Sequence, residues 1–523
     1  MQSSASRSFQ CFQTSQQAVP SPDGSLVAAV QHSQLVLRST IDDQIISSYS
    51  LPSTNNNTYR HLKLSHRPCL TGVDNPLRVL VANDDTIHVF EVQSPQWKAV
   101  IHSAAGNMGK IAQADFGANE DEVVVFSDFG FKATIWSLVT SRGVEVRDPK
   151  GSSRCHDYRP KTKHWAILTR ELARDNLLIL APGTHEILEN VELPTVDAQG
   201  VKWSSDGLWL AIWDTASSGY RVLIYTADGH LFKTFTGGQT VDEIGLGIKN
   251  IAWGPHGKHL AIGDYDDRVT ILANTSFHPI SSYTHLSSID PPQMDVWEEQ
   301  IHNSQSRTYV KVTRPSSPPS QSSLLGRNES ITGISLIAFN TDGALLASRS
   351  DSTPSTLWIC STTSQKPVAV LIHHAAIRSV HWHPTTADML LIHCALDNPV
   401  VYLWKSSWDM PVIRELRLDT IGGRMEASWL FRETHELSAL MIGNASNYTT
   451  ARISADGELL APSNVQQPDD QGPDDRFDGS LIDLSPIKLP QDDASFEDYE
   501  HSNANTGELD DTFHFRHLAK TTA

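Results

Sequence analysis

The stretch that decides the fold is Val201-Lys-Trp-Ser-Ser-Asp-Gly-Leu-Trp-Leu-Ala-Ile212. It joins a short apolar run that contains a tryptophan to a second apolar run, through a polar turn with Asp-Gly at its centre. Glycine adopts the positive φ that a tight hairpin turn requires, and aspartate tolerates it. The stretch therefore predicts two antiparallel strands joined by a tight turn.

The same phrase recurs along the chain. Clear copies are Ile251–Ile262, Leu336–Ala347 and Val380–Leu391, and a shortened copy, Ser21–Val30, lies near the start. Weaker units with the same rhythm are His61–Val92, Ile111–Leu138, Lys163–Glu192 and Glu426–Ile453. We count about nine units between residues 10 and 453, close to the spacing of roughly 40–45 residues that WD40 blades show.

Four-stranded units at this spacing predict an all-β fold, a WD40-like β-propeller over residues 10–453. The apolar runs alternate at period two or are continuous, whereas a coiled coil or helical solenoid needs a period near 3.5 or 3.6. Nine units are compatible with one large ring, and also with a seven- or eight-bladed ring that carries one or two extra sheets. For the repeat-defining residues we expect structural roles in turns and between blades; these residues are Trp203, Asp206, Gly207, Trp253, Gly257, Asp342, Gly343 and Trp382.

Two segments fall outside the repeat. Residues 286–330 are rich in Pro and Ser and are expected to form a disordered insertion between two blades, and residues 454–523 a disordered acidic tail. Within the tail, residues 466–511 hold 14 acidic and two basic residues, which accounts for −12 of the net charge of −19. This acidity disfavours binding to nucleic acid or to an anionic membrane.

The composition also bears on the compartment. No apolar run approaches the roughly 20 residues that span a bilayer, and no secretory signal is visible at the N-terminus. The five cysteines are odd in number, widely spaced and without a C-x-x-C pair, which is typical of a reduced, intracellular protein.

The sequence contains no motif of a familiar catalytic site: G-x-x-x-x-G-K-[ST], G-x-S-x-G and H-E-x-x-H are all missing. We therefore expect a protein that is not an enzyme and needs no cofactor. The densest ligand-like region admits either a metal site or structural histidines; it comprises His373, His374, His381, His383, His393 and Cys394.

Three features suggest contacts or regulation. Ser-Pro pairs at Ser94, Ser317 and Ser485 are candidate sites of proline-directed phosphorylation. Tyr265–Arg268 is either a contact surface or ordinary turn chemistry. The apolar and acidic stretch Ser480–Pro490 in the tail is either a solvated spacer or a linear docking motif.

The segment Val201–Leu272, with Leu336–Trp358 and Val380–Trp404, resembles the centrosomal and spindle-pole WD-repeat family. The resemblance implies a non-catalytic adaptor at the spindle pole body or another microtubule-organising centre in the cytoplasm. It implies a coiled-coil anchoring protein as partner, and in fungi a minus-end-directed kinesin, which together tether microtubule minus ends. The family supplies no catalytic residues to transfer.

A second hypothesis is a translation- or RNA-associated propeller scaffold. The propeller portion still carries about −7 and shows no basic stripe interleaved with aromatic residues, which weakens this alternative. Because the tubulin surface is acidic too, we expect any association with microtubules to run through protein partners.

Overall fold

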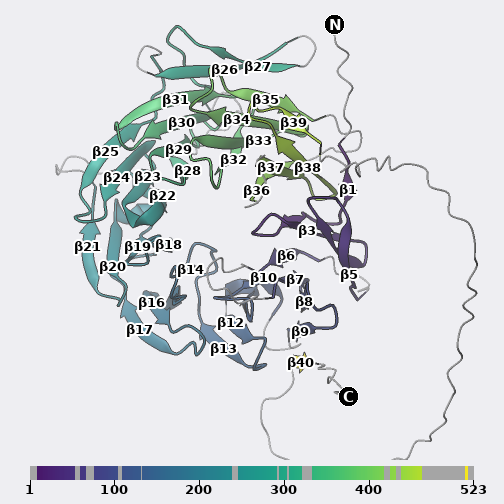
Figure 1. Ribbon diagram of the computed structural model, residues 1–523. Coiled ribbons are helices and arrows are strands. Elements are labelled where there is room, and N and C mark those ends of the chain that lie inside the picture. Colours follow the sequence, from purple (N-terminus) through teal and green to yellow (C-terminus); the bar gives the residue numbers. More distant parts are fainter. Residues whose placement is uncertain are drawn as a thin grey trace, which may run out of the picture.

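The computed structural model shows a ring of β-sheets (Figure 1). It describes residues 9–52, 59–65, 76–103, 109–130, 132–237, 245–290, 294–302, 306–320, 332–416, 424–431, 438–461 and 513–515. In these ranges the regular elements are strands and three short 3-10 helices, η1 (Asp128–Gly130), η2 (Ala216–Ser218) and η3 (Pro255–Gly257). No helix in this part of the chain has the length and apolar character needed to cross a membrane.

The described residues form nine sheets, so the chain is a nine-bladed propeller and the prediction of a WD40-like ring is confirmed. Each sequence unit corresponds to one blade. Blades 1 to 3 contain β2 (Val19–Pro20), β3 (Leu26–Gln31), β4 (Gln34–Ser39) and β5 (Ile45–Ser50); β6 (His61–Leu64), β7 (Arg78–Ala82), β8 (Thr86–Glu91) and β9 (Lys98–His102); and β10 (Ile111–Phe116), β11 (Glu122–Ser127), β12 (Lys132–Ser137) and β13 (Gly143–Arg147).

Blades 4 to 6 repeat this four-stranded antiparallel order, with the first strand innermost in the ring (Figure 1). They contain β14 (His156–Tyr158), β15 (Trp165–Glu171), β16 (Arg174–Leu180) and β17 (Ile187–Glu192); β18 (Gly200–Trp203), β19 (Trp209–Trp213), β20 (Val222–Thr226) and β21 (Leu231–Phe235); and β22 (Ile248–Trp253), β23 (His259–Asp264), β24 (Arg268–Ala273) and β25 (Pro279–Thr284).

Blades 7 and 8 keep the same order, and blade 9 is completed by the other end of the chain. Their strands are β28 (Ile334–Phe339), β29 (Leu345–Ser350), β30 (Thr356–Ser361) and β31 (Lys366–Ile372); β32 (Ile377–Trp382), β33 (Met389–Cys394), β34 (Val400–Lys405) and β35 (Val412–Glu415); and β36 (Glu426–Leu430), β37 (Ser438–Gly443), β38 (Asn447–Ile453), β39 (Leu459–Leu460) and β1 (Phe12–Gln13).

The ring closes where β1 pairs antiparallel with β38. Phe12 lies opposite Tyr448 in this pairing, and their ring centroids are 5.4 Å apart. The first described strand thus becomes the outermost strand of the last blade. A strand exchanged between the two ends of the chain supplies backbone hydrogen bonds that hold the ring shut without a covalent link.

The core consists of apolar layers between neighbouring blades. Each boundary between consecutive blades has its own cluster of buried side chains, including the one between blades 9 and 1, where Leu430 and Met441 pack with Val27 and Ala29. Because each sheet is covered on both faces, its inner strands are almost continuously apolar. For this reason Val79 and Leu80, adjacent on β7, are both fully buried.

The expectation that residues 286–330 lack regular structure is wrong for their central part. β26 (Asp295–Ile301) and β27 (Arg307–Lys311) form an antiparallel hairpin, and β26 pairs in parallel with β31, so blade 7 gains two outer strands. Figure 1 shows this hairpin outside the ring, above β31. Trp297 and Tyr309 are buried against blades 7 and 8, and this burial gives the segment the apolar contacts that its composition seemed to lack.

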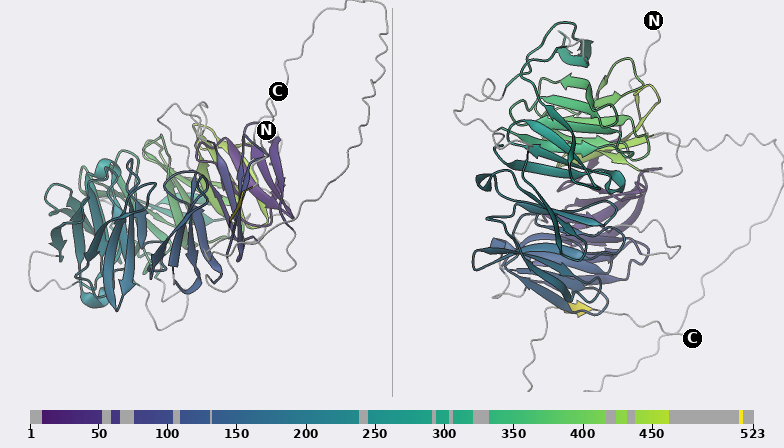
Figure 2. Two further views of the ribbon diagram at one scale, coloured as in Figure 1. Left: turned by 90° about the horizontal axis from the view of Figure 1, so that it is seen from below. Right: turned by 90° about the vertical axis from the view of Figure 1, so that its left-hand side faces the viewer.

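The tail also departs from its expected boundary. β39 pairs with β38, so blade 9 continues past residue 453, and β40 (Phe513–Phe515) pairs with β9 of blade 2. Figure 2 shows β40 beside the strands of blade 2 in its right-hand view. The rest of the tail, including Ser480–Pro490, lies outside the described residues.

Candidate protein-interaction face

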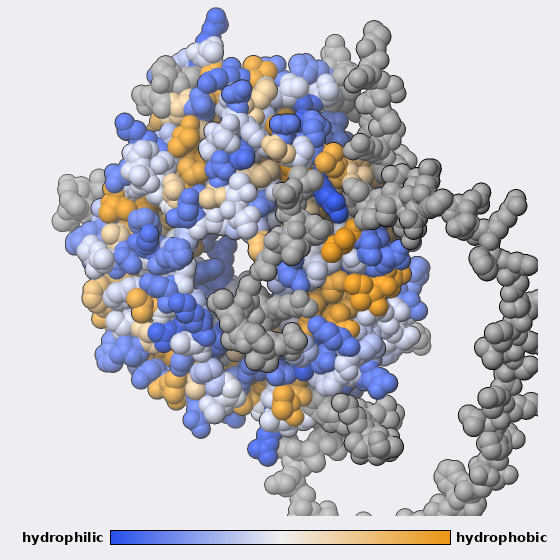
Figure 3. All heavy atoms as spheres, viewed as in Figure 1, coloured by the Kyte–Doolittle hydropathy of each residue, from blue (hydrophilic) through white to orange (hydrophobic). Residues whose placement is uncertain are grey.

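A pocket lies on one face of the ring, next to the innermost strands of blades 4 to 7. In a four-stranded antiparallel blade, the loop after the second strand and the loop after the fourth leave at the same end of the sheet. Loops of both kinds line a cavity of about 590 Å³, with Arg154, Asp197, Trp213, Lys249 and Tyr265 among its walls. Around the middle of the ring, Figure 3 shows mostly hydrophilic residues.

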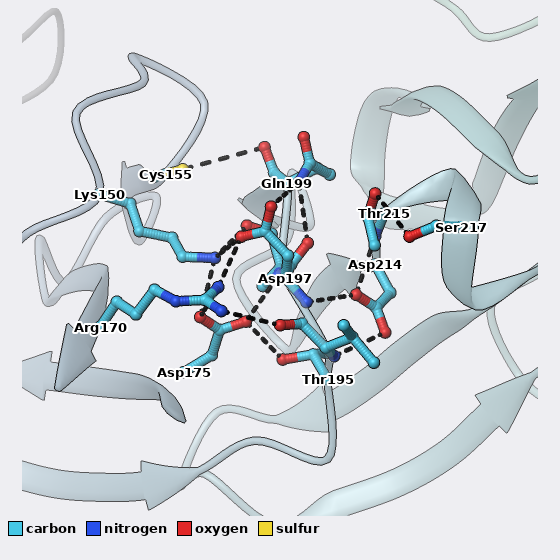
Figure 4. Close-up of polar contacts among 12 residues, drawn as sticks. Lys150, Cys155, Arg170, Asp175, Thr195, Asp197, Gln199, Asp214, Thr215 and Ser217 are labelled. Atoms are coloured by element: carbon cyan, nitrogen blue, oxygen red, sulfur yellow. Dashed lines mark hydrogen bonds and ion pairs between the residues drawn. The ribbon is translucent and has the colours of Figure 1, made fainter. Parts of the chain in front are cut away.

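Buried carboxylates organise the pocket wall (Figure 4). Asp175, on β16, has a fully buried side chain and lies 2.8 Å from Nζ of Lys150 and 3.2 Å from Arg170. Its other oxygen accepts hydrogen bonds from the Thr195 hydroxyl at 2.9 Å and the Ala198 amide at 2.6 Å. A buried charge is tolerated only when it is paired and hydrogen-bonded in this way. Asp175 therefore joins strand β15 and the two loops that carry Lys150 and Ala198 into one wall.

Asp197 sits at the exposed side of the same cluster. Its carboxylate lies 2.7 Å from Lys150 and 2.8 Å from Arg170. Burial opposes its ionisation, but the hydrogen bond and charge of Lys150 together with Arg170 outweigh burial and hold the pKa of Asp197 below its ordinary value of 3.8. The two cations of the wall are thus neutralised by two carboxylates.

Asp214 belongs to the Trp213-Asp214 dipeptide that the sequence places in the second strand rather than at the end of a blade. The structure shows what it does there. Its buried carboxylate accepts the backbone amides of Val196 at 3.1 Å and Asp197 at 2.9 Å, and it also accepts the amide of Thr215 at 2.8 Å. Asp214 thereby fixes the loop that carries Asp197 onto the loop that follows β19.

Two residues at the pocket differ from this paired arrangement. Arg154 is exposed, no described carboxylate lies within ion-pair distance of it, and its guanidinium donates one long hydrogen bond of 3.5 Å to the carbonyl of Lys249. Cys155 is buried, and burial raises the pKa of its thiol above 9.0, which keeps it from acting as a thiolate nucleophile. Among the described residues of the pocket, Arg154 is thus a cation without a carboxylate partner, and Cys155 is held as the thiol.

The repeat tryptophans link neighbouring blades. Trp253 donates its indole N–H to the carbonyl of Lys202 in the preceding blade at 3.1 Å, and Trp382 donates to Ala338 at 2.9 Å. Trp429 of blade 9, in a unit with weak sequence signal, makes the equivalent bond to His381 at 2.8 Å. Trp203 is buried and packs in the layer between blades 4 and 5.

The Asp-Gly residues of the repeat lie in turns. Asp206 accepts the amide of Leu208 at 3.0 Å, and Asp342 accepts that of Ala344 at 2.8 Å. The glycines of the three turns all have positive φ; they are Gly207 (75°), Gly257 (66°) and Gly343 (76°).

The histidines near residue 380 are dispersed. His373 is buried between the Tyr309 hydroxyl, 2.6 Å away, and the Ser355 carbonyl, 3.2 Å away. His383 accepts the amide of Thr386 at 2.9 Å and closes a turn. The remaining members of the region are His374, His381, His393 and Cys394. Among the described residues, no group of three or more His, Cys, Asp and Glu side chains is placed to hold a metal ion.

The other predicted sites are the three serines of the Ser-Pro pairs and the segment Tyr265–Arg268. Ser317 is exposed, Ser94 is half-buried and Ser485 lies outside the described residues. In the segment Tyr265–Arg268, Asp267 accepts the Gly333 amide of the next blade at 2.8 Å, while Tyr265 lines the pocket. The segment combines both interpretations, since it is a turn that also forms part of the candidate face.

The carboxylates of the pocket wall are the residues that sequence reasoning missed. Asp175 lies on β16 in a degenerate unit, and Asp197 lies in the loop between β17 and β18. The repeat gives no signal at either position. The one available signal was the Trp213-Asp214 dipeptide, whose displaced position marks the loop junction that it holds.

Comparison with known proteins finds similarity to WD repeat-containing proteins. It is 26% identical over 408 residues to WD repeat-containing protein WRAP73 of Mus musculus, covering 73% of this chain and 83% of the relative. An uncharacterized WD repeat-containing protein of Schizosaccharomyces pombe is 26% identical over 361 residues, covering 65% of this chain and 70% of the relative. No protein-family model matches the chain.

Two solved structures overlap with this one only loosely. A crystal structure of a eukaryotic initiation factor has a TM-score of 0.49 at 13% identity, with coverage of 78% of this chain and 90% of the other. The C-terminal WD40 domain of Sif2 has a TM-score of 0.45 at 10% identity, with coverage of 78% and 97%.

Proposed function

We propose that this chain is a non-catalytic scaffold of the centrosome or spindle pole, which helps to anchor microtubule minus ends and organise the mitotic spindle through protein partners. The spindle-pole assignment rests on the family resemblance of the segments between residues 201 and 404. The similarity to WD repeat-containing proteins over most of the chain supports the scaffold role.

The observation that best supports the scaffold role is the pocket on the face of the ring formed by blades 4 to 7. Four blades supply its walls, and Asp175, Asp197 and Asp214 satisfy the cations and backbone amides around them. A site whose charges are already paired is rigid and suited to binding rather than to proton transfer. The exposed Arg154 at its rim suits a carboxylate of a partner protein.

The test is the behaviour of the full chain in dividing cells. We expect a tagged protein to concentrate at spindle poles, and affinity purification from mitotic cells to recover a coiled-coil protein. A minus-end-directed kinesin is the further partner to look for. A protein that stays diffuse through mitosis, with no coiled-coil partner, would contradict the proposal.

A charge reversal tests the face directly. We expect Arg154→Glu to lower partner recovery by at least about tenfold, since charge-assisted contacts at an interface contribute about 1.5–3 kcal/mol. Arg142→Glu is the matched control, because Arg142 is also exposed but lies in the turn between β12 and β13, at the opposite end of its blade. Equal loss with both variants would place the contact elsewhere.

Two further outcomes separate this proposal from its rivals. Purified protein that binds bare microtubules tightly and with strong salt dependence would contradict the indirect association. Co-sedimentation with ribosomes at moderate salt would favour a translation-associated scaffold instead.

A further inference from the structure

The outermost strand of blade 2 is paired on both of its edges. On its inner side, β9 pairs with β8, with Ile101 opposite Ile87. On its outer side it pairs antiparallel with β40, and Phe513, His514 and Phe515 lie opposite Ile101, Val100 and Ala99. A segment from near the C-terminus therefore extends the blade from a distance of about 400 residues along the chain.

This arrangement is unusual within the ring. In the described part of the chain, the outermost strands of most blades, such as β13 and β21, pair on their inner side only. The other exception is β31, which the hairpin β26–β27 covers. An uncovered edge presents unpaired N–H and C=O groups and readily accepts an additional strand.

The length of β40 sets the strength of the contact. Three residue pairs give a short ladder, and each backbone hydrogen bond contributes about 0.5–1.5 kcal/mol net. Tethering within one chain favours such a contact, because a linked segment has an effective concentration in the millimolar range when the linker is short and flexible, and less when it is longer. A short tethered strand is thus held reversibly, and a longer strand in the same register competes with it.

We propose that the outer edge of β9 is a strand-docking site whose resident occupant is the chain's own segment Phe513–Phe515. Docking joins the acidic region 466–511 to the propeller at both of its ends. It also shields an edge that would otherwise accept another strand. This role does not depend on where in the cell the protein acts.

Hydrogen exchange on the full chain tests the proposal. His514→Pro removes a backbone N–H and restricts φ, so it should release β40 from β9. We expect the amides of β9 whose N–H groups point to β40 to exchange about tenfold faster in this variant, while those that point to β8 and those of β13 are unchanged. A tenfold change corresponds to about 1.4 kcal/mol of local protection. Unchanged exchange in β9 would overturn the proposal.

A peptide and a control variant make the result specific. A synthetic peptide of residues 509–518, Leu-Asp-Asp-Thr-Phe-His-Phe-Arg-His-Leu, should restore protection of β9 when added to the His514→Pro chain. Asn503→Pro, in the same tail, should leave exchange in β9 as it is in the unmodified chain. Failure of the peptide to protect β9, or faster exchange with Asn503→Pro, would count against a docking site for this segment.

Discussion

The carboxylate of Glu299, on the inserted strand β26, accepts a hydrogen bond of 2.8 Å from the hydroxyl of Tyr402 on β34 of blade 8. The same buried carboxylate lies 2.6 Å from Arg307 on β27 and accepts the backbone amide of His374 at 2.8 Å. Burial opposes its ionisation, but the hydrogen bonds from His374, Arg307 and Tyr402 outweigh burial and hold the pKa of Glu299 below 4.5. The hairpin is therefore fastened to two blades through one ionised group.

Loss of this charge should weaken the docked hairpin. Glu299→Gln leaves the nearly buried guanidinium of Arg307 with only its longer contact to Glu415, at 3.8 Å, and removing one member of a buried pair costs about 3–5 kcal/mol. We expect the free energy of unfolding, measured by urea denaturation, to fall by about 3 kcal/mol. The neighbouring Glu298 is exposed, so Glu298→Gln should change it by less than about 0.5 kcal/mol. Equal effects would mean that the pairing contributes nothing.

The ring could be predicted from sequence because its signals are local. An Asp-Gly turn between two apolar runs, as at Asp206-Gly207, encodes one hairpin, and the nine units that share this rhythm of apolar runs correspond to the nine blades. The docking of the hairpin β26–β27 could not be predicted from sequence, because the parallel pairing of β26 with β31 joins Val296 to Val370 without any turn between them. Long-range pairing of this kind leaves no periodic pattern.

The tryptophan bonds between blades should act independently. Trp253→Phe and Trp382→Phe each remove one indole N–H donor, at the boundaries of blades 5 and 6 and of blades 7 and 8. We expect each to lower the free energy of unfolding by about 1 kcal/mol. The double variant should lose the sum to within about 0.5 kcal/mol, because the two sites share no partners. A strongly non-additive result in urea denaturation would indicate coupling around the ring.

A buried histidine should make stability depend on pH. Burial lowers the pKa of His373 to about 4, against its usual 6.5, and its contacts with Tyr309 and Ser355 suit the neutral ring. The unfolded chain therefore takes up the proton first as the pH falls. The stabilisation by neutral His373 is complete above pH 6.5 and is lost progressively between pH 6.5 and about 4, to a total of about 3 kcal/mol.

The measurement is the difference in free energy of unfolding between the unmodified chain and His373→Gln across this pH range. As the pH falls from 6.5 to 4, the free energy of unfolding of the unmodified chain should fall by up to about 3 kcal/mol relative to that of His373→Gln. His374→Gln, at the adjacent exposed position, is the control for the substitution itself. A difference for His373→Gln that stays constant with pH would show that its burial does not control its protonation.

The pocket shows where sequence reasoning stops. Asp214 follows Trp213 in a Trp-Asp pair that is visible in the sequence, but its partners Val196 and Asp197 lie in the preceding loop. Carboxylates that hold loops together act across blades, and their spacing in the sequence carries no record of it. The turns, by contrast, involve neighbouring residues, so the effect of a substitution in a turn can be predicted from its local geometry.

Two glycines with similar backbone conformation separate the cost of φ from the cost of space. Gly257 has φ +66°, and a Cβ there would lie 2.5 Å from the carboxylate carbon of Asp206 in the neighbouring blade; Gly183 has φ +76° and nothing within 4 Å. Gly183→Ala should cost about 1 kcal/mol, the strain of a left-handed conformation. Gly257→Ala should cost more, by at least about 1 kcal/mol, because the Asp206 carboxylate must also move and weaken the bonds that it makes to Ser204 and Leu208. Urea denaturation of both variants gives the comparison, and equal losses would mean that blades 5 and 6 are loosely fitted at this turn.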